Sequence, residues 1–250
     1  MTTVSAETIY DTYAEFYTSL VETMLAERDG FWHATRAVFD ARLQGKLDGR
    51  NVLDVGCGEG HLGRHLLQFC PERVIGVDIS TALLDHARLR AKAYGPALHY
   101  RHDDAQALVS IETGSIDVAV SNLAIMDIPD HRRLFAAVRR VLKPGGLFVF
   151  SMMHPCFEAP FDDRGQFLMD PGEPDGRTAY TIRRYATEGR WYAGKEGMRS
   201  RVGAHHRTVS TVLCDLLDAG FTLTHLNEPV TKAGGLGGEV PRTLVIEVRA

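Results

Sequence analysis

The chain has 250 residues, of which 44% are hydrophobic and 24% charged, as in a globular protein with one sizeable core. Its 28 basic and 32 acidic side chains give a formal net charge of −4 without any basic run, which argues against a nucleic-acid substrate. No apolar stretch is long enough to span a membrane, and the first residues lack the features of a signal peptide. We therefore expect a cytoplasmic protein.

The N-terminal segment predicts two helices. Apolar residues recur with helical spacing from Ile9 to Met24, and Ser5 is a suitable N-cap for that helix. Gly30 then separates it from a second helix, Phe31 to Leu43.

The middle of the chain alternates between short apolar runs and helical patterns. The expected strands are Asn51–Val55, Val74–Val77, Ala97–Arg101, Ile116–Ser121 and Leu147–Met152. The expected helices run from His61 to Phe69, from Ser80 to Tyr94 and from Asp130 to Leu142. This alternation predicts a doubly wound α/β fold, in which a parallel sheet carries helices on both faces.

The last third of the chain departs from this alternation. Residues from His154 to about Gly203 show no strong period, and an insertion of that length in a compact domain is expected to be functional, such as a lid. A helix, Val209–Ala219, follows it. The final strands, Phe221–Leu226 and Leu244–Val248, are joined without a helix, so we expect them to form an antiparallel edge.

The most informative motif lies where the first expected strand ends. The strand breaks into three glycines, Gly56, Gly58 and Gly60, before the next helix begins. Such a turn lets a ligand lie against bare backbone amides. The second strand ends on Asp78, where the hydroxyls of a ribose would need an acceptor.

Two classes of ligand fit a glycine turn followed by an acidic strand end. A dinucleotide fingerprint would place its third glycine where this chain has His61, and Asp54 would repel a diphosphate. A cationic ligand such as S-adenosylmethionine (SAM), with its sulfonium and ammonium groups, would tolerate Asp54. A nicotinamide or flavin enzyme, and an ordinary turn with no ligand, remain the alternatives.

The sequence from Asp54 to Gly60, DVGCGEG, resembles the first motif of the class I SAM-dependent methyltransferases, and further segments extend the resemblance over most of the chain. The resemblance implies one Rossmann-like domain, residues 1–250, with a mostly parallel seven-stranded sheet and an antiparallel edge strand. It also implies that residues 1–48 form a helical lid and that residues 154–204 form an insertion on the acceptor side. The implied cofactor is SAM, with no metal, since the four cysteines are too widely spaced for a zinc site.

The same resemblance implies a set of cofactor-binding residues. The glycines would face the methionine moiety, Asp54 its ammonium group, Asp78 the ribose, and Asp104, rather than a solvated Asp103, the adenine. Tyr10 and Tyr17 would close the site from an N-terminal helix. The full set is Asp54, Gly56, Gly58, Gly60, Asp78, Ile79, Asp104, Ala105, Asn122, Tyr10 and Tyr17.

Three histidines are candidates for a catalytic base. His154 directly follows the fifth strand, at the sheet edge where ligands bind, although it could instead shape the turn at Pro155. His205 and His206 are expected to open the helix that follows the insertion. A hydroxyl acceptor would need such a base to remove its proton.

The sequence thus predicts methyl transfer from SAM to a small molecule, with oxygen as the first choice of acceptor, then nitrogen, then carbon. A role in specialised metabolism and a monomeric or homodimeric state are expected, without nucleic-acid or membrane partners. The alternatives are a SAM-binding enzyme with another reaction, such as cyclisation of SAM itself, and a nicotinamide-dependent oxidoreductase.

Overall fold

A computed structural model describes residues 6–157, 167–169, 178–180, 182, 184–192, 198–231, 238 and 240–250. The expected N-cap Ser5 and part of the expected insertion, residues 154–204, lie outside these ranges. None of the helices in the described ranges combines the length and apolarity that crossing a bilayer requires.

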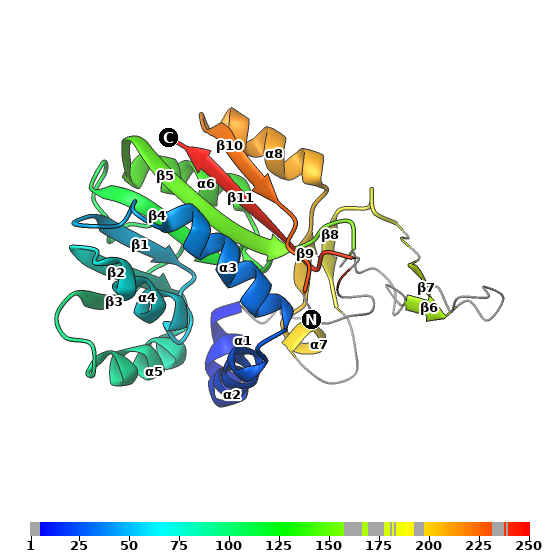
Figure 1. The fold of residues 1–250 in the computed structure, drawn as a ribbon, viewed down its shortest axis with the longest axis horizontal. Coiled ribbons are helices and arrows are strands. Elements are labelled where there is room, and N and C mark those ends of the chain that lie inside the picture. Colours follow the sequence, from blue (N-terminus) through cyan, green and yellow to red (C-terminus); the bar gives the residue numbers. More distant parts are fainter. Residues whose placement is uncertain are drawn as a thin grey trace.

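One seven-stranded sheet with the order β10-β11-β5-β4-β1-β2-β3 forms the centre of the protein (Figure 1). Five strands pair in parallel: β1 (Asn51–Val55), β2 (Arg73–Asp78), β3 (Leu98–His102), β4 (Ile116–Asn122) and β5 (Leu142–Met153). Strand β11 (Thr243–Arg249) lies antiparallel between β5 and the edge strand β10 (Thr222–Asn227). The predicted mostly parallel sheet with an antiparallel edge is confirmed.

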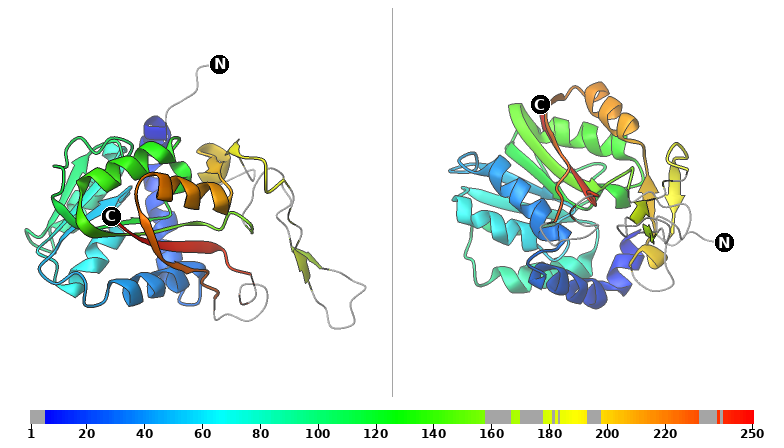
Figure 2. Two further views of the ribbon diagram at one scale, coloured as in Figure 1. Left: turned by 90° about the horizontal axis from the view of Figure 1, so that it is seen from above. Right: turned by 45° about the vertical axis from the view of Figure 1, so that its right-hand side comes forward.

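Helices cover both faces of this sheet (Figure 2). On one face, α3 (Phe31–Leu43) and α4 (His61–Leu66) share an apolar cluster with β1 and β2. On the other face, α6 (His131–Val141) and α8 (Val209–Asp218) pack over β4, β5 and β11. The helix α5 (Thr81–Ala91) lies against β3, beyond α4.

Side-chain caps fix where several helices begin. The hydroxyl of Ser80 accepts a hydrogen bond from the backbone amide of Leu83, which confirms the cap expected for α5. Asp130 caps α6 in the same way through the amide of Arg133. Both helices start close to the carboxyl ends of the parallel strands, where a ligand can bind. The caps therefore hold the loops at this edge of the sheet in place.

Two sequence predictions need correction before the insertion. The first helix is not continuous but breaks at Tyr13 into α1 (Ala6–Thr12) and α2 (Ala14–Ala26). Strand β5 begins at Leu142, earlier than expected, because Gly145 and Gly146, which follow the predicted helix end, pair with the residue after β11. Gly145 donates its amide hydrogen to Ala250, whose own amide donates to Gly146.

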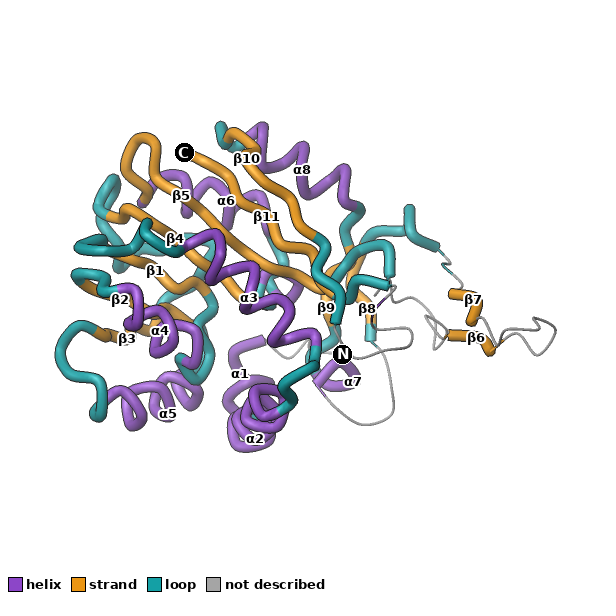
Figure 3. The backbone as a smooth tube through the Cα atoms, viewed as in Figure 1, coloured by secondary structure: helices purple, strands orange, loops and turns teal. Residues whose placement is uncertain are grey.

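The insertion contains short elements that the sequence pattern did not reveal (Figure 3). They are β6 (Phe167–Met169), β7 (Thr178–Tyr180), β8 (Gly189–Trp191), α7 (Met198–Arg201) and β9 (Ala204–His206). Strands β6 and β7 form one antiparallel pair, and β8 and β9 form another. The prediction that His205 and His206 open a helix is wrong, because both lie in β9 and α8 starts only at Val209, capped by Thr208.

A buried carboxylate joins α3 to the antiparallel part of the sheet. Glu247 of β11 is 2% exposed and accepts hydrogen bonds from Arg42 at 2.7 and 3.1 Å, from Lys46 at 3.3 Å and from Thr224 at 2.9 Å. Burial opposes its ionisation, but the hydrogen bonds from Arg42 and Thr224 and the charges of Lys46 and Arg42 lower the pKa of Glu247 to about 2.

We predict that Glu247→Gln lowers the free energy of unfolding by on the order of 2 kcal/mol at pH 7. A lowered pKa stabilises the fold above the ordinary value of 4.5, and this contribution is lost as the pH falls through about 2. The difference between wild type and variant in urea titrations should therefore shrink between pH 4.5 and pH 2. The exposed Glu72→Gln is the control, and an effect of Glu247→Gln that does not change with pH would contradict the assignment.

Candidate cofactor and acceptor site

The glycine turn after β1 has a backbone that other residues rarely adopt. Gly56, Gly58 and Gly60 have φ angles of 68°, 53° and 81°. A Cβ on Gly56 would lie 2.5 Å from that of Ala124, and one on Gly60 would lie 2.2 Å from the hydroxyl of Tyr100. Position 56 must therefore be a glycine because Ala124 in the loop after β4 leaves no room for a Cβ. Position 60 must be a glycine because the Tyr100 side chain of β3 leaves none.

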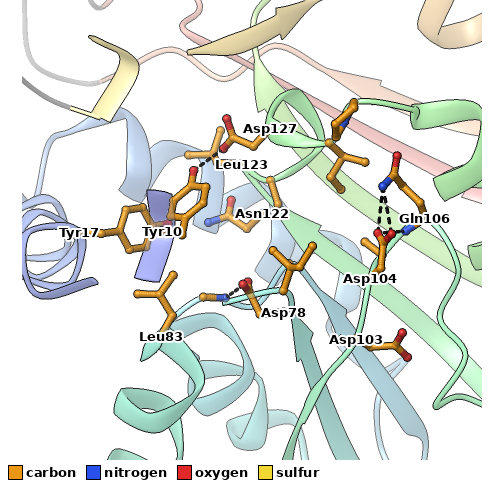
Figure 4. Close-up of a pocket in the computed structure, with 17 residues that line it drawn as sticks. Tyr10, Tyr17, Asp78, Leu83, Asp103, Asp104, Gln106, Asn122, Leu123 and Asp127 are labelled. Carbon is orange, nitrogen blue, oxygen red and sulfur yellow. Dashed lines mark hydrogen bonds between the residues drawn. The ribbon is translucent and has the colours of Figure 1, made fainter. Parts of the chain in front are cut away.

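A pocket with about 710 Å³ of empty space opens at the carboxyl edge of the sheet (Figure 4). The turns after β1, β2, β3 and β4 contribute to its walls, together with the N-terminal helices. Of the predicted cofactor-binding residues, those lining it are Gly56, Gly58, Asp78, Ile79, Asp104, Ala105, Asn122, Tyr10 and Tyr17. The described lining does not include Asp54 or Gly60.

Asp78 joins the turns after β1 and β2. One carboxylate oxygen accepts the amide hydrogen of Gly58 at 2.8 Å, and the other accepts that of Ser80 at 2.9 Å. Burial raises the pKa of Asp78, although these backbone hydrogen bonds act in the opposite direction. Each carboxylate oxygen has further lone-pair capacity, so both can accept from a vicinal diol.

Asp54 lies beneath the glycine turn and not in the pocket wall. Its side chain is 1% exposed, and one carboxylate oxygen accepts the amide hydrogen of Gly63 at 3.1 Å, in the first turn of α4. Burial raises the pKa of Asp54 to about 7, against this bond. The expectation that Asp54 faces the ammonium group, through water or a backbone turn, stays a prediction, and the contacts of its carboxylate are those of a brace for the turn and helix.

Two neighbouring aspartates after β3 have different surroundings. The carboxylate of Asp103 accepts the amide hydrogens of Val109 at 3.2 Å and Ser110 at 2.8 Å, as well as the Ser110 hydroxyl at 2.6 Å. The expectation that Asp103 is a solvated loop carboxylate is wrong, because it is 4% exposed and holds this loop together. Asp104 accepts from the backbone and side-chain amides of Gln106 at the pocket wall.

The N-terminal helices and the insertion meet at Asp127, which sequence reasoning missed. Tyr10 and Tyr17 stack edge to face, with ring centroids 5.6 Å apart, and the Tyr10 hydroxyl donates to Asp127 at 2.8 Å (Figure 4). Arg199 of α7 forms an ion pair with the same carboxylate and also donates to the carbonyl of Gly203 at 2.7 Å. Asp127 lies five residues after Asn122, at the same sheet edge, which was the available signal.

The three predicted catalytic histidines are absent from the described lining of this pocket. His154 is 1% exposed; its Nε2 lies 2.8 Å from Glu228, and its Nδ1 accepts the amide hydrogen of Cys156 at 3.1 Å. His206 Nε2 lies 2.7 Å from the carbonyl of Tyr185. His205 lines a smaller hollow, where burial and the charges of Arg207 and Arg190 lower its pKa to about 4. Their catalytic role stays a prediction without support from these contacts.

The charges in the pocket wall discriminate between the two classes of ligand. The described lining residues include four aspartates, Asp78, Asp103, Asp104 and Asp127, but no lysine or arginine. Such a wall would repel a diphosphate, whereas it attracts a ligand with a sulfonium and an ammonium. The left-handed glycine cradle and the diol acceptor Asp78 fit the remaining parts of SAM.

Comparisons with known proteins agree with this assignment. Residues 52–146 match the family model described as a methyltransferase domain. The ubiquinone biosynthesis O-methyltransferase of Methylococcus capsulatus is 32% identical over 136 residues, 52% of this chain and 57% of that protein. The matched region spans about half the length of most of the curated relatives.

Solved structures extend the similarity to most of the chain. A SAM-dependent methyltransferase from Mesorhizobium loti is 29% identical with a TM-score of 0.71, and the match covers 88% of this chain and 100% of that one. SpnF, a 4+2 cyclase, is 15% identical with a TM-score of 0.67 over 97% and 94% of the two chains, which shows a common fold alone.

The fold and the acidic, glycine-lined pocket define a Rossmann-like domain that binds an adenosyl ligand. Residues 52–146 match the methyltransferase-domain family, and the fold and the solved structures support a class I SAM-dependent methyltransferase whose cofactor is SAM. The predicted family and cofactor are thereby confirmed.

We predict that Asp78→Asn weakens the binding of S-adenosylhomocysteine at least tenfold. The amide keeps the shape of the side chain but loses charge-assisted bonds, which contribute about 1.5–3 kcal/mol each. Isothermal titration calorimetry measures the affinity, and circular dichroism checks the fold. Asp85→Asn, on the exposed side of α5, makes the same change of charge elsewhere. Equal affinities for wild type and Asp78→Asn would show that the ribose is held by other groups.

We also predict that Asp127→Asn loosens the two helices that contact this carboxylate, α1 through Tyr10 and α7 through Arg199. We call these two helices the covers. The variant loses the charge that pairs with Arg199 and weakens the acceptor for Tyr10, so amide hydrogen exchange should accelerate in α1 and in α7 together. Tyr10→Phe removes the hydrogen bond to α1 alone and should leave exchange in α7 near the wild-type rate. If Asp127→Asn accelerates exchange in only one of the two helices, Asp127 does not couple them.

Proposed function

We propose that this chain transfers the methyl group of SAM to a hydroxyl oxygen of a small molecule. The observation that carries the proposal is that Asn122 borders two neighbouring spaces. This residue lines the acidic pocket and also a second hollow beside α3 and α4, which we take as the place of the acceptor. The ubiquinone biosynthesis relatives, which are named as O-methyltransferases, support oxygen as the acceptor atom.

Methyl transfer from a sulfonium is an in-line displacement, and the bound cofactor supplies an activated methyl group. The protein's part is to hold the reacting groups in line and to exclude water. Asp78 and the glycine turn would fix the adenosyl part, while Tyr10 and Tyr17 would cover the pocket. Asn122 lines both spaces, and its Oδ1 accepts from the Ser151 hydroxyl at 2.7 Å, so its amide is held in one orientation.

Other acceptors and reactions follow in order of support. A neutral amine needs alignment more than a base, so nitrogen comes second, and an activated carbon comes third. A different reaction class, in which SAM is bound but no methyl is transferred, is the next alternative, and SpnF, which shares the fold, is named as a 4+2 cyclase. A nicotinamide-dependent oxidoreductase has the least support, because four carboxylates line the pocket where a diphosphate would lie. Cytoplasmic location, specialised metabolism and a monomeric or homodimeric state belong to the same proposal.

The test is incubation with SAM labelled in its methyl group and three panels of acceptors: phenols and catechols, primary amines, and 2-oxo acids. We expect label in a methyl ether, together with stoichiometric S-adenosylhomocysteine, by mass spectrometry. S-adenosylhomocysteine alone should bind with a micromolar Kd, roughly −8 kcal/mol, and NAD should not bind measurably by calorimetry.

The other outcomes each reject a stated part of the proposal. Label in an amine or on carbon would reject oxygen as the acceptor atom. Consumption of SAM without label in any acceptor would favour a reaction of SAM itself. Tight NAD binding without binding of S-adenosylhomocysteine would reject the family's cofactor for this chain.

A further inference from the structure

Glu59 and His61 form a charged pair at the start of α4, on either side of Gly60. The side chain of Glu59 is fully buried, and that of His61 is 14% exposed. Glu59 Oε1 lies 3.2 Å from His61 Nδ1, and this buried oxygen accepts no hydrogen bond within the part of the chain that the structure describes. The other oxygen, Oε2, pairs with Arg64 at 2.6 Å and with Arg90.

This arrangement keeps the Glu59 carboxylate ionised. Burial opposes its ionisation, but His61 and Arg64 together lower the pKa of Glu59 to about 2. An ionised carboxylate can only accept hydrogen bonds, so the His61 nitrogen that faces it must carry a hydrogen. The neutral ring is therefore the Nδ1–H tautomer, and its Nε2 atom carries the lone pair, which accepts a long hydrogen bond from the Asn122 amide that an acceptor hydroxyl would replace.

His61 Nε2 faces Asn122, the residue that lines both spaces. Nε2 lies 3.4 Å from Asn122 Nδ2, and the bond from Ser151 to Asn122 Oδ1 turns that amide nitrogen toward the histidine. His61 itself lines the 410 Å³ hollow beside Asn122. Among the described histidines, His61 is thus directly linked to a residue of the cofactor pocket, unlike the three that the sequence suggested.

The hollow beside His61 is built for a flat molecule with a negative group. Trp32 and Phe39 of α3 give it aromatic walls, and the Trp32 ring centroid lies 5.1 Å from that of His61. Arg36, one helical turn after Trp32, adds a guanidinium to the lining. A guanidinium suits a carboxylate or phosphate on an aromatic ring, so an anionic phenol matches these surfaces.

Resting on the proposed O-methyl transfer, we propose that His61 is the general base for an anionic phenolic acceptor, and that Glu59 is its positioning residue. The acceptor O–H bond breaks, and its proton passes to His61 Nε2. The oxygen forms a bond to the methyl carbon as the C–S bond breaks, and that electron pair stays on sulfur. The buried Glu59 carboxylate stabilises the imidazolium until it releases the proton to water.

The first test requires no substrate. In protein with ¹⁵N-labelled histidine, the spectrum of neutral His61, assigned by its loss in His61→Gln, should show the Nδ1–H tautomer. In Glu59→Gln the amide oxygen must face Arg64 and Arg90, so its NH₂ group faces His61 and should convert the ring to the Nε2–H tautomer. An Nε2–H tautomer in the wild-type protein would overturn the proposal.

The second test measures turnover with the phenolic acceptor found by the labelling experiment. His61→Gln should lose about 10²–10⁴-fold in kcat, the usual contribution of a general base, with KM for SAM within a few-fold of wild type. Glu59→Gln should lose kcat as well, because its histidine presents N–H to the acceptor. His86→Gln, on α5 beside the exposed Glu15, is the control and should keep wild-type turnover.

The possible failures are distinguishable. An active wild-type enzyme whose His61→Gln variant keeps kcat within a few-fold overturns the base, while methyl transfer stands. A wild-type enzyme that methylates no hydroxyl overturns the proposed function and the base with it. Calorimetry with S-adenosylhomocysteine checks that each variant still folds and binds, and Arg36→Gln, expected to raise KM for an anionic phenol but not for its neutral analogue, tests the acceptor class.

Discussion

The two hydrogen bonds that Asp78 accepts from backbone amides are the constraint on which the rest of the site depends. They fasten the turn after β1 to the turn after β2, through Gly58 and Ser80. The amides of Gly56 and Cys57 donate to the carbonyl of Val77 as well, so the glycine turn is held against the end of β2 at several points. The Asp78 carboxylate is therefore a structural tie between two turns that also lines the pocket.

Carboxylates perform different tasks around this tie, and their surroundings decide which. Asp54 braces the first turn of α4 from below, and Asp103 closes the loop after β3, so both carboxylates are taken up by backbone amides. Asp127 joins two covers, and Glu59 faces a histidine. The task of each carboxylate is decided by the groups that surround it, because a buried carboxylate is stable as an anion only where amide hydrogens or cations point at it.

The sequence predicted the sheet and most of the adenosyl end of the site, because both depend on local signals. Strand and helix periods, the three glycines and the acidic end of β2 are read within a few residues of one another. Asp103 was misjudged because consecutive residues after a strand face opposite sides, and nothing in the sequence says which side holds the loop. The pairing of β8 with β9, and with it the place of His205 and His206, joins segments whose partners the sequence does not name.

Asp127, Arg199 and Tyr10 illustrate the same limit, since they are separated by 72 and 117 positions along the chain. His61 is different. It stands next to the motif, and the sequence showed only that it replaces a glycine of the dinucleotide fingerprint. Its meaning depends on the direction that Glu59 and Asn122 give to its ring, which is a property of the folded turn.

The meeting of both covers at one carboxylate has a consequence for the order of events in a catalytic cycle. Since α1 and α7 hold Asp127 together, neither can swing aside without disturbing the anchor of the other. Exchange of the spent nucleoside for a fresh one, and of product for substrate, then share a single opening step. The rate at which the contacts of Asp127 break would then limit both exchanges, so cofactor exchange and product release would share one rate constant.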